Sequence, residues 1–314
     1  MNFLEGDYSK GYVDGNVNVI KDASIVPSIL MKLPGGTSFL NLTQDGNLDH
    51  VRIENGTLEI LHHFDVELPP FGNLTHGIFD REYGQIWITM FDKEANRSVL
   101  FVSDYLGIYP KLLGIEDEKN NDPLRFSNPS PTFLSEPGRM FRGMCINERY
   151  RLFFVTEAAI DPDDGDDNGN LYVWSLNNVN YFYIIRSTAP LNPWDCASFD
   201  DQLAVTDFKN GTIIVSTLRQ VVPSAPAVVP KQTRLVADET LISLPSGLYF
   251  DIVGNLIVTG RNSIDVFSLV SLSSNDTSPS FRRMWTTSVT DFECCNKAIA
   301  VVGDKNTRIY IVVS

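Results

Sequence analysis

Six polar or aromatic side chains stand at the start of short apolar stretches, and their types suit acid–base chemistry. They are His76, Arg142, Trp194, Asp195, Ser246 and Asp291. The stretches that follow have the apolar density of buried strands. If such strands surround one axis, these side chains converge at one end, where they could orient a small molecule and move protons. We take Arg142, His76 and Asp195 as candidate catalytic residues and the other three as candidate substrate-binding residues.

The same residues also have a structural interpretation. Asp195 and Asp291 could cap turns, while His76 and Arg142 could be solvated at a rim. Removing a turn cap lowers stability, whereas removing a site residue lowers activity, so substitutions separate the two interpretations.

A recurrent strand pattern must position these residues. Seven similar arms span 15–22, 56–64, 98–104, 170–176, 211–218, 263–269 and 307–314. A second apolar strand precedes most arms, often with Thr before an acidic residue or Gly, and a third element ends in Asp or Asn, as in RGMCIN (142–147). Three strands per unit, joined by tight turns and followed by a variable stretch, indicate a four-stranded blade.

This repetition predicts an all-β fold, a single-domain β-propeller over residues 1–314 with four-stranded antiparallel blades around a central channel. Seven counted units allow six or seven blades. No helical periodicity is sustained, while 21 Gly and 17 Pro supply turns. We expect the first strand, 2–8, or a neighbouring segment to pair with the unit that ends at 314, which joins the chain ends; the alternative is that a first strand is missing from this sequence.

Two insertions between blades, 105–140 and 219–245, interrupt the spacing. Long connections in compact domains are often functional. We therefore expect aromatic members such as Tyr109 and Phe126 to cover an apolar ligand and count them among the substrate-binding residues. Alternatively, the insertions support blade edges.

Composition restricts partners and compartment. The net charge of −14 argues against nucleic acid, and no apolar run is long enough to span a membrane. The lack of a signal peptide favours the cytoplasm, while six Asn-x-Ser/Thr sites keep secretion open. The four cysteines do not form a disulfide framework, and we interpret them as small buried side chains, with a redox or metal role as the alternative. No oligomeric state is indicated.

The acidic stretch 160–170 is a candidate calcium loop. Asp164, Asp166 and Asn168 repeat the alternating oxygen ligands that open such loops. Ser175 stands where an EF-hand needs its bidentate Glu, so that motif is excluded. Calcium is thus a possible ligand, with a solvated acidic loop as the alternative, and no cofactor is required.

The units at 192–218 and 244–269 resemble those of propellers grouped with gluconolactonase, strictosidine synthase and fungal biosynthetic-cluster propellers, which include proteins of hetero-Diels–Alder cyclisation. In gluconolactonase-like hydrolases, a metal is held by an early Glu and by an Asn and an Asp that enter inner strands. Asp195 fits one entry and Glu5 is the nearest early Glu, but Arg142 stands where Asn is expected. Because a cation repels a divalent metal, the resemblance implies a metal-free pocket here.

Signatures of covalent hydrolysis and phosphate binding are missing from the sequence. Our leading hypothesis is an enzyme of specialised metabolism that promotes cyclisation or proton transfer of an apolar small-molecule substrate. The alternatives are a metal-dependent lactonase or esterase, and a non-catalytic scaffold for protein partners.

Overall fold

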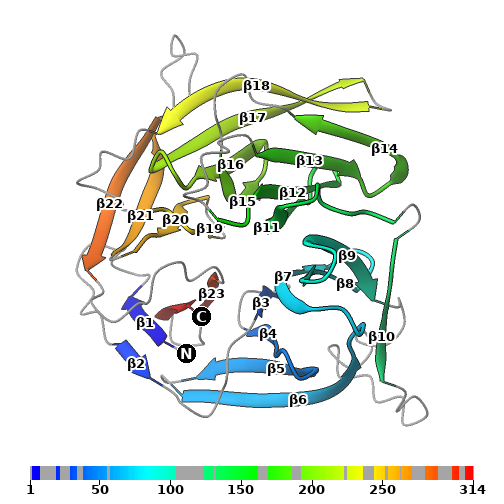
Figure 1. The fold of residues 1–314 in the computed structure, drawn as a ribbon. Coiled ribbons are helices and arrows are strands. Elements are labelled where there is room, and N and C mark those ends of the chain that lie inside the picture. Colours follow the sequence, from blue (N-terminus) through cyan, green and yellow to red (C-terminus); the bar gives the residue numbers. More distant parts are fainter. Residues whose placement is uncertain are drawn as a thin grey trace. The chain divides into compact units, whose positions relative to one another are not determined.

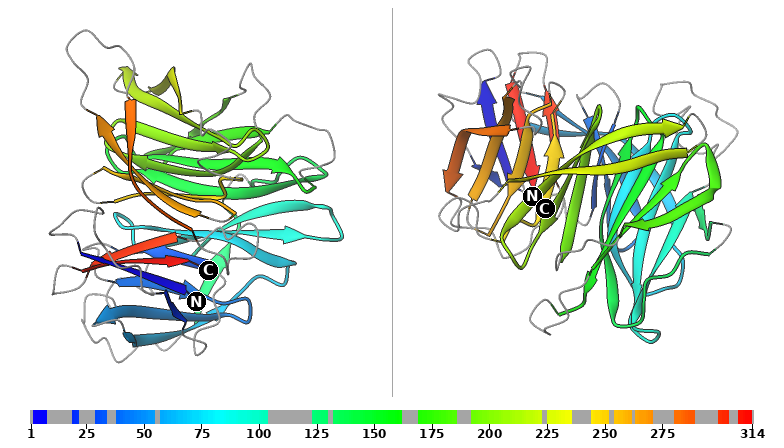
Figure 2. Two further views of the ribbon diagram at one scale, coloured as in Figure 1. Left: turned by 90° about the vertical axis from the view of Figure 1, so that its left-hand side faces the viewer. Right: turned by 90° about the horizontal axis from the view of Figure 1, so that it is seen from above.

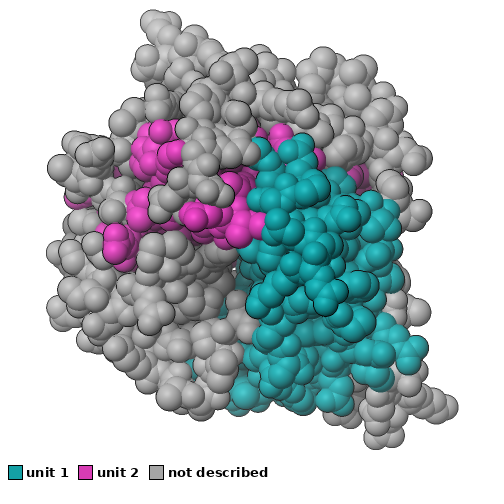
Figure 3. Space-filling model, in the orientation of Figure 1, with its two compact units in different colours: residues 1–141, 298–314 teal, residues 142–297 magenta. Residues whose placement is uncertain are grey.

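Every regular element that the structure describes is a β-strand. The computed structural model describes residues 2–7, 19–21, 29–33, 38–54, 57–103, 123–129, 132–161, 169–185, 192–222, 225–235, 244–251, 254–261, 263–270, 280–288, 299–303 and 308–313. The all-β prediction is confirmed. Two compact units contain these strands (Figure 3). The prediction of one domain over 1–314 stays a prediction.

The unit of residues 142–297 contains three successive sets of strands, each ordered as in the chain (Figure 1). They are β11 (Arg139–Asn147, whose first residues belong to the other unit), β12 (Leu152–Ala159), β13 (Asn170–Ser175) and β14 (Asn178–Ile185); β15 (Pro193–Phe199), β16 (Gln202–Asp207), β17 (Thr212–Val222) and β18 (Ala225–Leu235); β19 (Gly247–Phe250), β20 (Leu256–Thr259), β21 (Ser263–Val270) and β22 (Ser280–Ser288). β15 contacts both β12 and β19, so successive sheets pack through their inner strands.

The unit of residues 1–141 and 298–314 is built in the same way. Its strands are β3 (Ile29–Lys32), β4 (Ser38–Leu42), β5 (Asn47–Glu54) and β6 (Thr57–Glu67); β7 (Asn73–Asp80), β8 (Gln85–Asp92), β9 (Arg97–Ser103) and β10 (Leu124–Ser127); and β1 (Asn2–Asp7), β2 (Val19–Lys21), β23 (Ile299–Gly303) and β24 (Arg308–Val313). β10 is antiparallel to β9 and parallel to β6, which joins two of these sheets.

The two chain ends share one sheet, ordered β2-β1-β24-β23. β1 pairs antiparallel with β24 from Asn2↔Val313 to Asp7↔Arg308, and Figure 2 shows blue β1 beside red β24. The predicted pairing of the ends is confirmed. β2 and β24, which come from the first and the last predicted arm, therefore lie in the same sheet.

In two sheets a buried threonine hydroxyl of the second strand bonds the backbone of the first strand. Gly143 donates its backbone N–H to Thr156 Oγ1 at 2.8 Å, and Asp195 does the same to Thr206 Oγ1 at 2.8 Å. The register of β15 shifts between Pro193 and Cys196, so a bulge takes backbone N–H groups out of the ladder. The hydroxyl satisfies a donor that would otherwise be buried without a partner.

Asx side chains open the turns between first and second strands, as the sequence predicts for two of them. Asn147 Oδ1 accepts the Tyr150 N–H at 2.8 Å, and Asp251 Oδ1 accepts the Asn255 N–H at 2.8 Å. Each bond fixes the direction in which the next strand leaves, and so the level at which its residues face their neighbours.

The described parts of both predicted insertions contain strand. Residues 219–222 and 225–235 belong to the β17–β18 hairpin, where we expected a connection between blades. In 105–140, Phe126 lies on β10 and packs against the core of the first unit, and Leu134 forms a bridge with Val99 of β9. These segments therefore supply the outer strands β10 and β18 and a bridge to the edge of β9. The alternating apolar pattern of the sequence did not reveal these outer strands.

Candidate functional site

The predicted site residues occupy two register positions at the start of inner strands. His76 pairs with Thr89 and Gly247 pairs with Thr259, while Asp195 bonds Thr206. Arg142, Trp194 and Ser246 stand one residue earlier in their strands. The register of β7 shifts just before His76 and that of β15 shifts across Trp194 and Asp195, so these side chains stand at irregular positions of their strands.

Asp195 links two neighbouring sheets of its unit. Its Oδ2 accepts the backbone N–H of Leu248 on β19 at 2.8 Å, and its Oδ1 accepts that of Cys196 at 2.8 Å. The residue is 5% exposed, and a Cβ on Gly143 would lie 2.3 Å from Oδ1. This carboxylate is packed between strands β11, β15 and β19, which supports the structural interpretation of Asp195.

Arg142 lies in a stack of planar groups. Its guanidinium carbon is 3.9 Å from the centre of the Trp194 ring, and Trp194 stacks on Phe208 with centroids 4.2 Å apart. Arg142 Nη2 also donates to the carbonyls of Ala159 and Ile160 at 2.8 and 2.7 Å. The arginine is buried, so it is not the solvated rim residue of the alternative interpretation.

A buried carboxylate that the sequence analysis did not select lies at the end of β12. Glu157 is 0% exposed, and its Oε2 accepts from Asn170 Nδ2 at 2.6 Å and from the Tyr172 hydroxyl at 2.9 Å. The signal was the Thr-Glu pair in RLFFVTEA (151–158), which we had assigned to a strand end. A carboxylate held by two donors can accept a proton in a fixed direction.

Other predicted residues are placed as follows. Ser246 is 1% exposed and its Oγ lies 3.5 Å from the Thr259 carbonyl oxygen, and His76 is half-buried on β7. Residues Tyr109, Asp164, Asp166, Asn168 and Asp291 lie outside the described residues. The calcium loop and part of the substrate-binding set therefore stay predictions.

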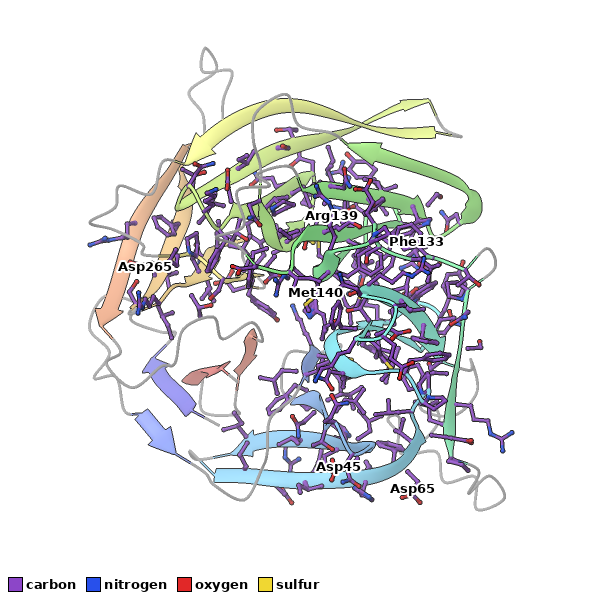
Figure 4. The ribbon with its side chains drawn as sticks, viewed as in Figure 1. Asp45, Asp65, Phe133, Arg139, Met140 and Asp265 are labelled. Atoms are coloured by element: carbon purple, nitrogen blue, oxygen red, sulfur yellow. The ribbon has the colours of Figure 1, made fainter. Side chains whose placement is uncertain are left out.

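Not every buried carboxylate of this unit belongs to the candidate set. Asp265 on β21, labelled in Figure 4, is 0% exposed, accepts from Ser263 Oγ at 2.7 Å and lies 3.7 Å from Arg283 Nη1. Its partners come from its own hairpin, which identifies an ion pair within one sheet.

The other unit holds a second polar group on β4, β5 and β6. His50 is 7% exposed, its Nε2 lies 2.9 Å from Ser38 Oγ, and its ring stacks on that of His62 at 5.7 Å between centroids. Burial, and then the charges of His62 and Arg52, lower the pKa of His50 to about 4. His50 is therefore neutral at physiological pH, and its buried position makes the folded state less stable when acid protonates the unfolded chain.

The described residues offer neither a metal-ligand cluster nor a membrane-spanning helix. They contain no group of three or more His, Cys, Asp or Glu arranged to hold a metal ion. Nor do they contain a helix long and apolar enough to cross a membrane. One predicted glycosylation site, Asn41, is 0% exposed on β4, so the folded chain cannot carry a glycan there.

Comparisons with known proteins identify the fold. No family model matches the chain, and no curated protein matches its sequence. The structure of a luciferin-regenerating enzyme matches with a TM-score of 0.57 at 11% identity, covering 99% of this chain and 95% of that one. The periplasmic gluconolactonase of Pseudomonas aeruginosa matches with 0.56 at 13% identity, covering 98% and 89%. The fold is that of a β-propeller, as in these two structures. The predicted resemblance is confirmed at the level of fold.

Proposed function

We propose that this β-propeller has six blades and is an enzyme that converts a small apolar organic molecule by proton transfer or cyclisation. Six blades follow from sheets of four strands when both chain ends contribute to one sheet. The candidate site is the start of β11 and β15 and the end of β12. Its members are Arg142, Glu157 and Trp194, with Asp195 as the residue that holds the strands together.

One observation supports an enzyme over a scaffold. Arg142, Glu157 and Trp194 are all more than nine-tenths buried at the same end of adjoining strands. Burial of a cation and a carboxylate costs free energy unless partners compensate it, and here carbonyls, an amide and a hydroxyl compensate both groups at one end of adjoining strands. Buried ionisable groups of this kind concentrate at catalytic sites.

Each group has a distinct chemical task. Glu157 is the proton acceptor, oriented by Asn170 and Tyr172, and Tyr172 can return a proton through its hydroxyl. The Trp194 ring supplies apolar surface, and Arg142 above it supplies positive charge for an enolate or alkoxide. Low local polarity strengthens these interactions because water does not screen them.

Lactone hydrolysis is the second candidate, and the fold likeness to the periplasmic gluconolactonase favours it. Arg142, at an inner-strand entry, disfavours a divalent cation near it. The two candidates differ in metal dependence. Hydrolysis of δ-gluconolactone that is abolished by EDTA and restored by calcium would select the hydrolase.

The test uses dihydrocoumarin, an apolar aromatic lactone, as the probe. We expect it to quench tryptophan fluorescence, and we expect the wild type to catalyse exchange of its protons α to the carbonyl with D2O, the turnover that reports proton transfer rather than hydrolysis. Glu157→Gln should lower turnover about 100-fold or more, because a general base contributes at least that factor, while binding persists. The exposed Glu94→Gln is the matched control.

Turnover per folded molecule decides the outcome. Equal turnover by wild type and Glu157→Gln would remove Glu157 from the mechanism. Lack of binding and turnover for both lactones would overturn the enzyme proposal in favour of the scaffold.

A further inference from the structure

Two cysteine thiols meet between neighbouring sheets of the 142–297 unit. Cys145 lies on β11 and Cys196 on β15, they are 5% and 3% exposed, and both belong to one apolar cluster with Phe154. Each thiol affects the pKa of the other, and Cys196 Sγ lies 4.0 Å from the Phe154 carbonyl oxygen. Both thiols are free in this structure.

The strands that carry these cysteines come unusually close. Two residues before Cys145, a Cβ on Gly143 would lie 2.7 Å from the Cα of Asp195, the residue before Cys196. Side chains two apart on a strand share a face, so Cys145 also points toward β15. A disulfide needs Cα atoms about 4.4 to 6.8 Å apart, a separation that only closely packed backbones offer.

We propose that Cys145 and Cys196 are a disulfide site that is oxidised while the chain folds in the presence of a small-molecule disulfide such as glutathione disulfide. One thiolate attacks the oxidant and releases one reduced glutathione. The second thiolate then attacks the mixed disulfide and releases another. Two thiols lose two protons and two electrons, and the one oxidant disulfide is reduced to two thiols.

Burial decides when this reaction can happen. Burial also raises the pKa of both thiols above the ordinary value, so the folded protein holds little of the reactive thiolate. An oxidant reaches the thiols only before the sheets close over them. The bond would therefore record the compartment of folding: present after folding in an oxidising compartment and missing after folding in a reducing one.

The bond would join two successive sheets across a loop of about 50 residues. Closing a loop of that length restricts the unfolded chain, and a bond that follows an existing contact adds little strain to the folded one. The cross-link would therefore raise the melting temperature.

The experiment refolds the full chain from denaturant with reduced and oxidised glutathione, and compares it with native protein exposed to the same mixture. We expect refolded protein to lose two hydrogens in mass and to yield a peptide linking Cys145 to Cys196. Its melting temperature should rise by about 5 °C or more and fall back with reductant. Native protein should react at least tenfold more slowly.

Paired variants assign the effect. The double variant Cys294→Ser/Cys295→Ser should keep the linked peptide and the stabilisation, whereas Cys145→Ser/Cys196→Ser should lose both. Peptide mapping of the wild type gives the same answer should the second variant fail to fold. The proposal would be overturned if the refolded wild type regained its fold with Cys145 and Cys196 still open to alkylation, or linked instead to Cys294 or Cys295.

Discussion

The β7–β8 pair of one unit and the β11–β12 pair of the other both have a hydrogen-bonded threonine hydroxyl on their second strand, but the residue after that threonine differs. In β8, Thr89 Oγ1 meets Thr75 Oγ1 at 2.8 Å, and in β12, Thr156 Oγ1 accepts from Gly143 N at 2.8 Å. The residue that follows the threonine is Met90 in the first pair and Glu157 in the second. Both are buried, at 1% and 0% exposed.

This difference separates architecture from chemistry. In β12 and β16 the threonine hydroxyl accepts a backbone N–H of the preceding strand, a buried group that needs a partner. The next side chain faces the other side of the strand, so it can change without disturbing that bond. The repeat therefore retains its structural residue, while the adjoining position is free to carry a functional carboxylate.

Gly143→Ala should have the largest effect on this comparison. The new Cβ would lie 2.7 Å from the Asp195 Cα, and backbone cannot move aside cheaply. We expect a loss of about 3 kcal/mol in the free energy of unfolding, measured by urea denaturation. The matched variant in the other unit is Gly77→Ala, whose Cβ would meet the Ile29 side chain at 2.8 Å and should cost less. Equal losses would show that β11 and β15 are not packed as closely as described.

Asp195→Ala should cause the second-largest loss in the free energy of unfolding. It leaves the N–H groups of Leu248 and Cys196 without their carboxylate acceptor in a dry interior, at a cost of about 2 to 3 kcal/mol. Asp92→Ala is the control, because water can replace the partner of its turn amides. Thermal unfolding of both variants checks this. If Asp195→Ala were as stable as wild type but inactive, Asp195 would be a catalytic residue rather than a link between sheets.

His50 should make the stability of the unit formed by residues 1–141 and 298–314 sensitive to acid. Its pKa is about 4 in the folded chain and 6.5 in the unfolded one. Its neutral form therefore contributes stability that is complete above pH 6.5 and is lost as the pH falls toward 4. Between pH 7 and pH 5 we expect a loss of about 2 kcal/mol from this group in urea denaturation.

The variant His50→Gln should remove most of that pH dependence. His63→Gln is the matched control, because it removes an exposed imidazole from the same sheet. An unchanged pH dependence in His50→Gln would assign the acid response to another group.

The threonine comparison itself should give the smallest effect. Thr206→Val leaves the Asp195 N–H without an acceptor and should cost about 1 to 2 kcal/mol. Thr89→Val should cost less, because Thr75 Oγ1 also donates to the Thr89 carbonyl at 3.0 Å, a bond that survives the change. Differential scanning calorimetry of both variants measures the difference. Identical losses would mean that the two hydroxyls are equivalent after all.

The sequence alone determined the strands that repeat and the turns between them. Apolar alternation, Asx residues such as Asn147 and Asp251, and the threonines are local signals, because each acts on its own backbone or on the adjacent strand. The pairing of 2–8 with the final arm could also be predicted, since a sheet with an open edge needs a partner.

Only the tertiary structure decided which side chains lie close together in space. The register of β15 shifts between Pro193 and Cys196, which interrupts the strand at Asp195, and no local pattern in the sequence reveals it. Arg142 contacts Ala159, Ile160 and Trp194, and Cys145 lies in one apolar cluster with Cys196 of another sheet. Burial, stacking and thiol proximity depend on how successive sheets pack, and that packing brings together residues that are far apart in the chain.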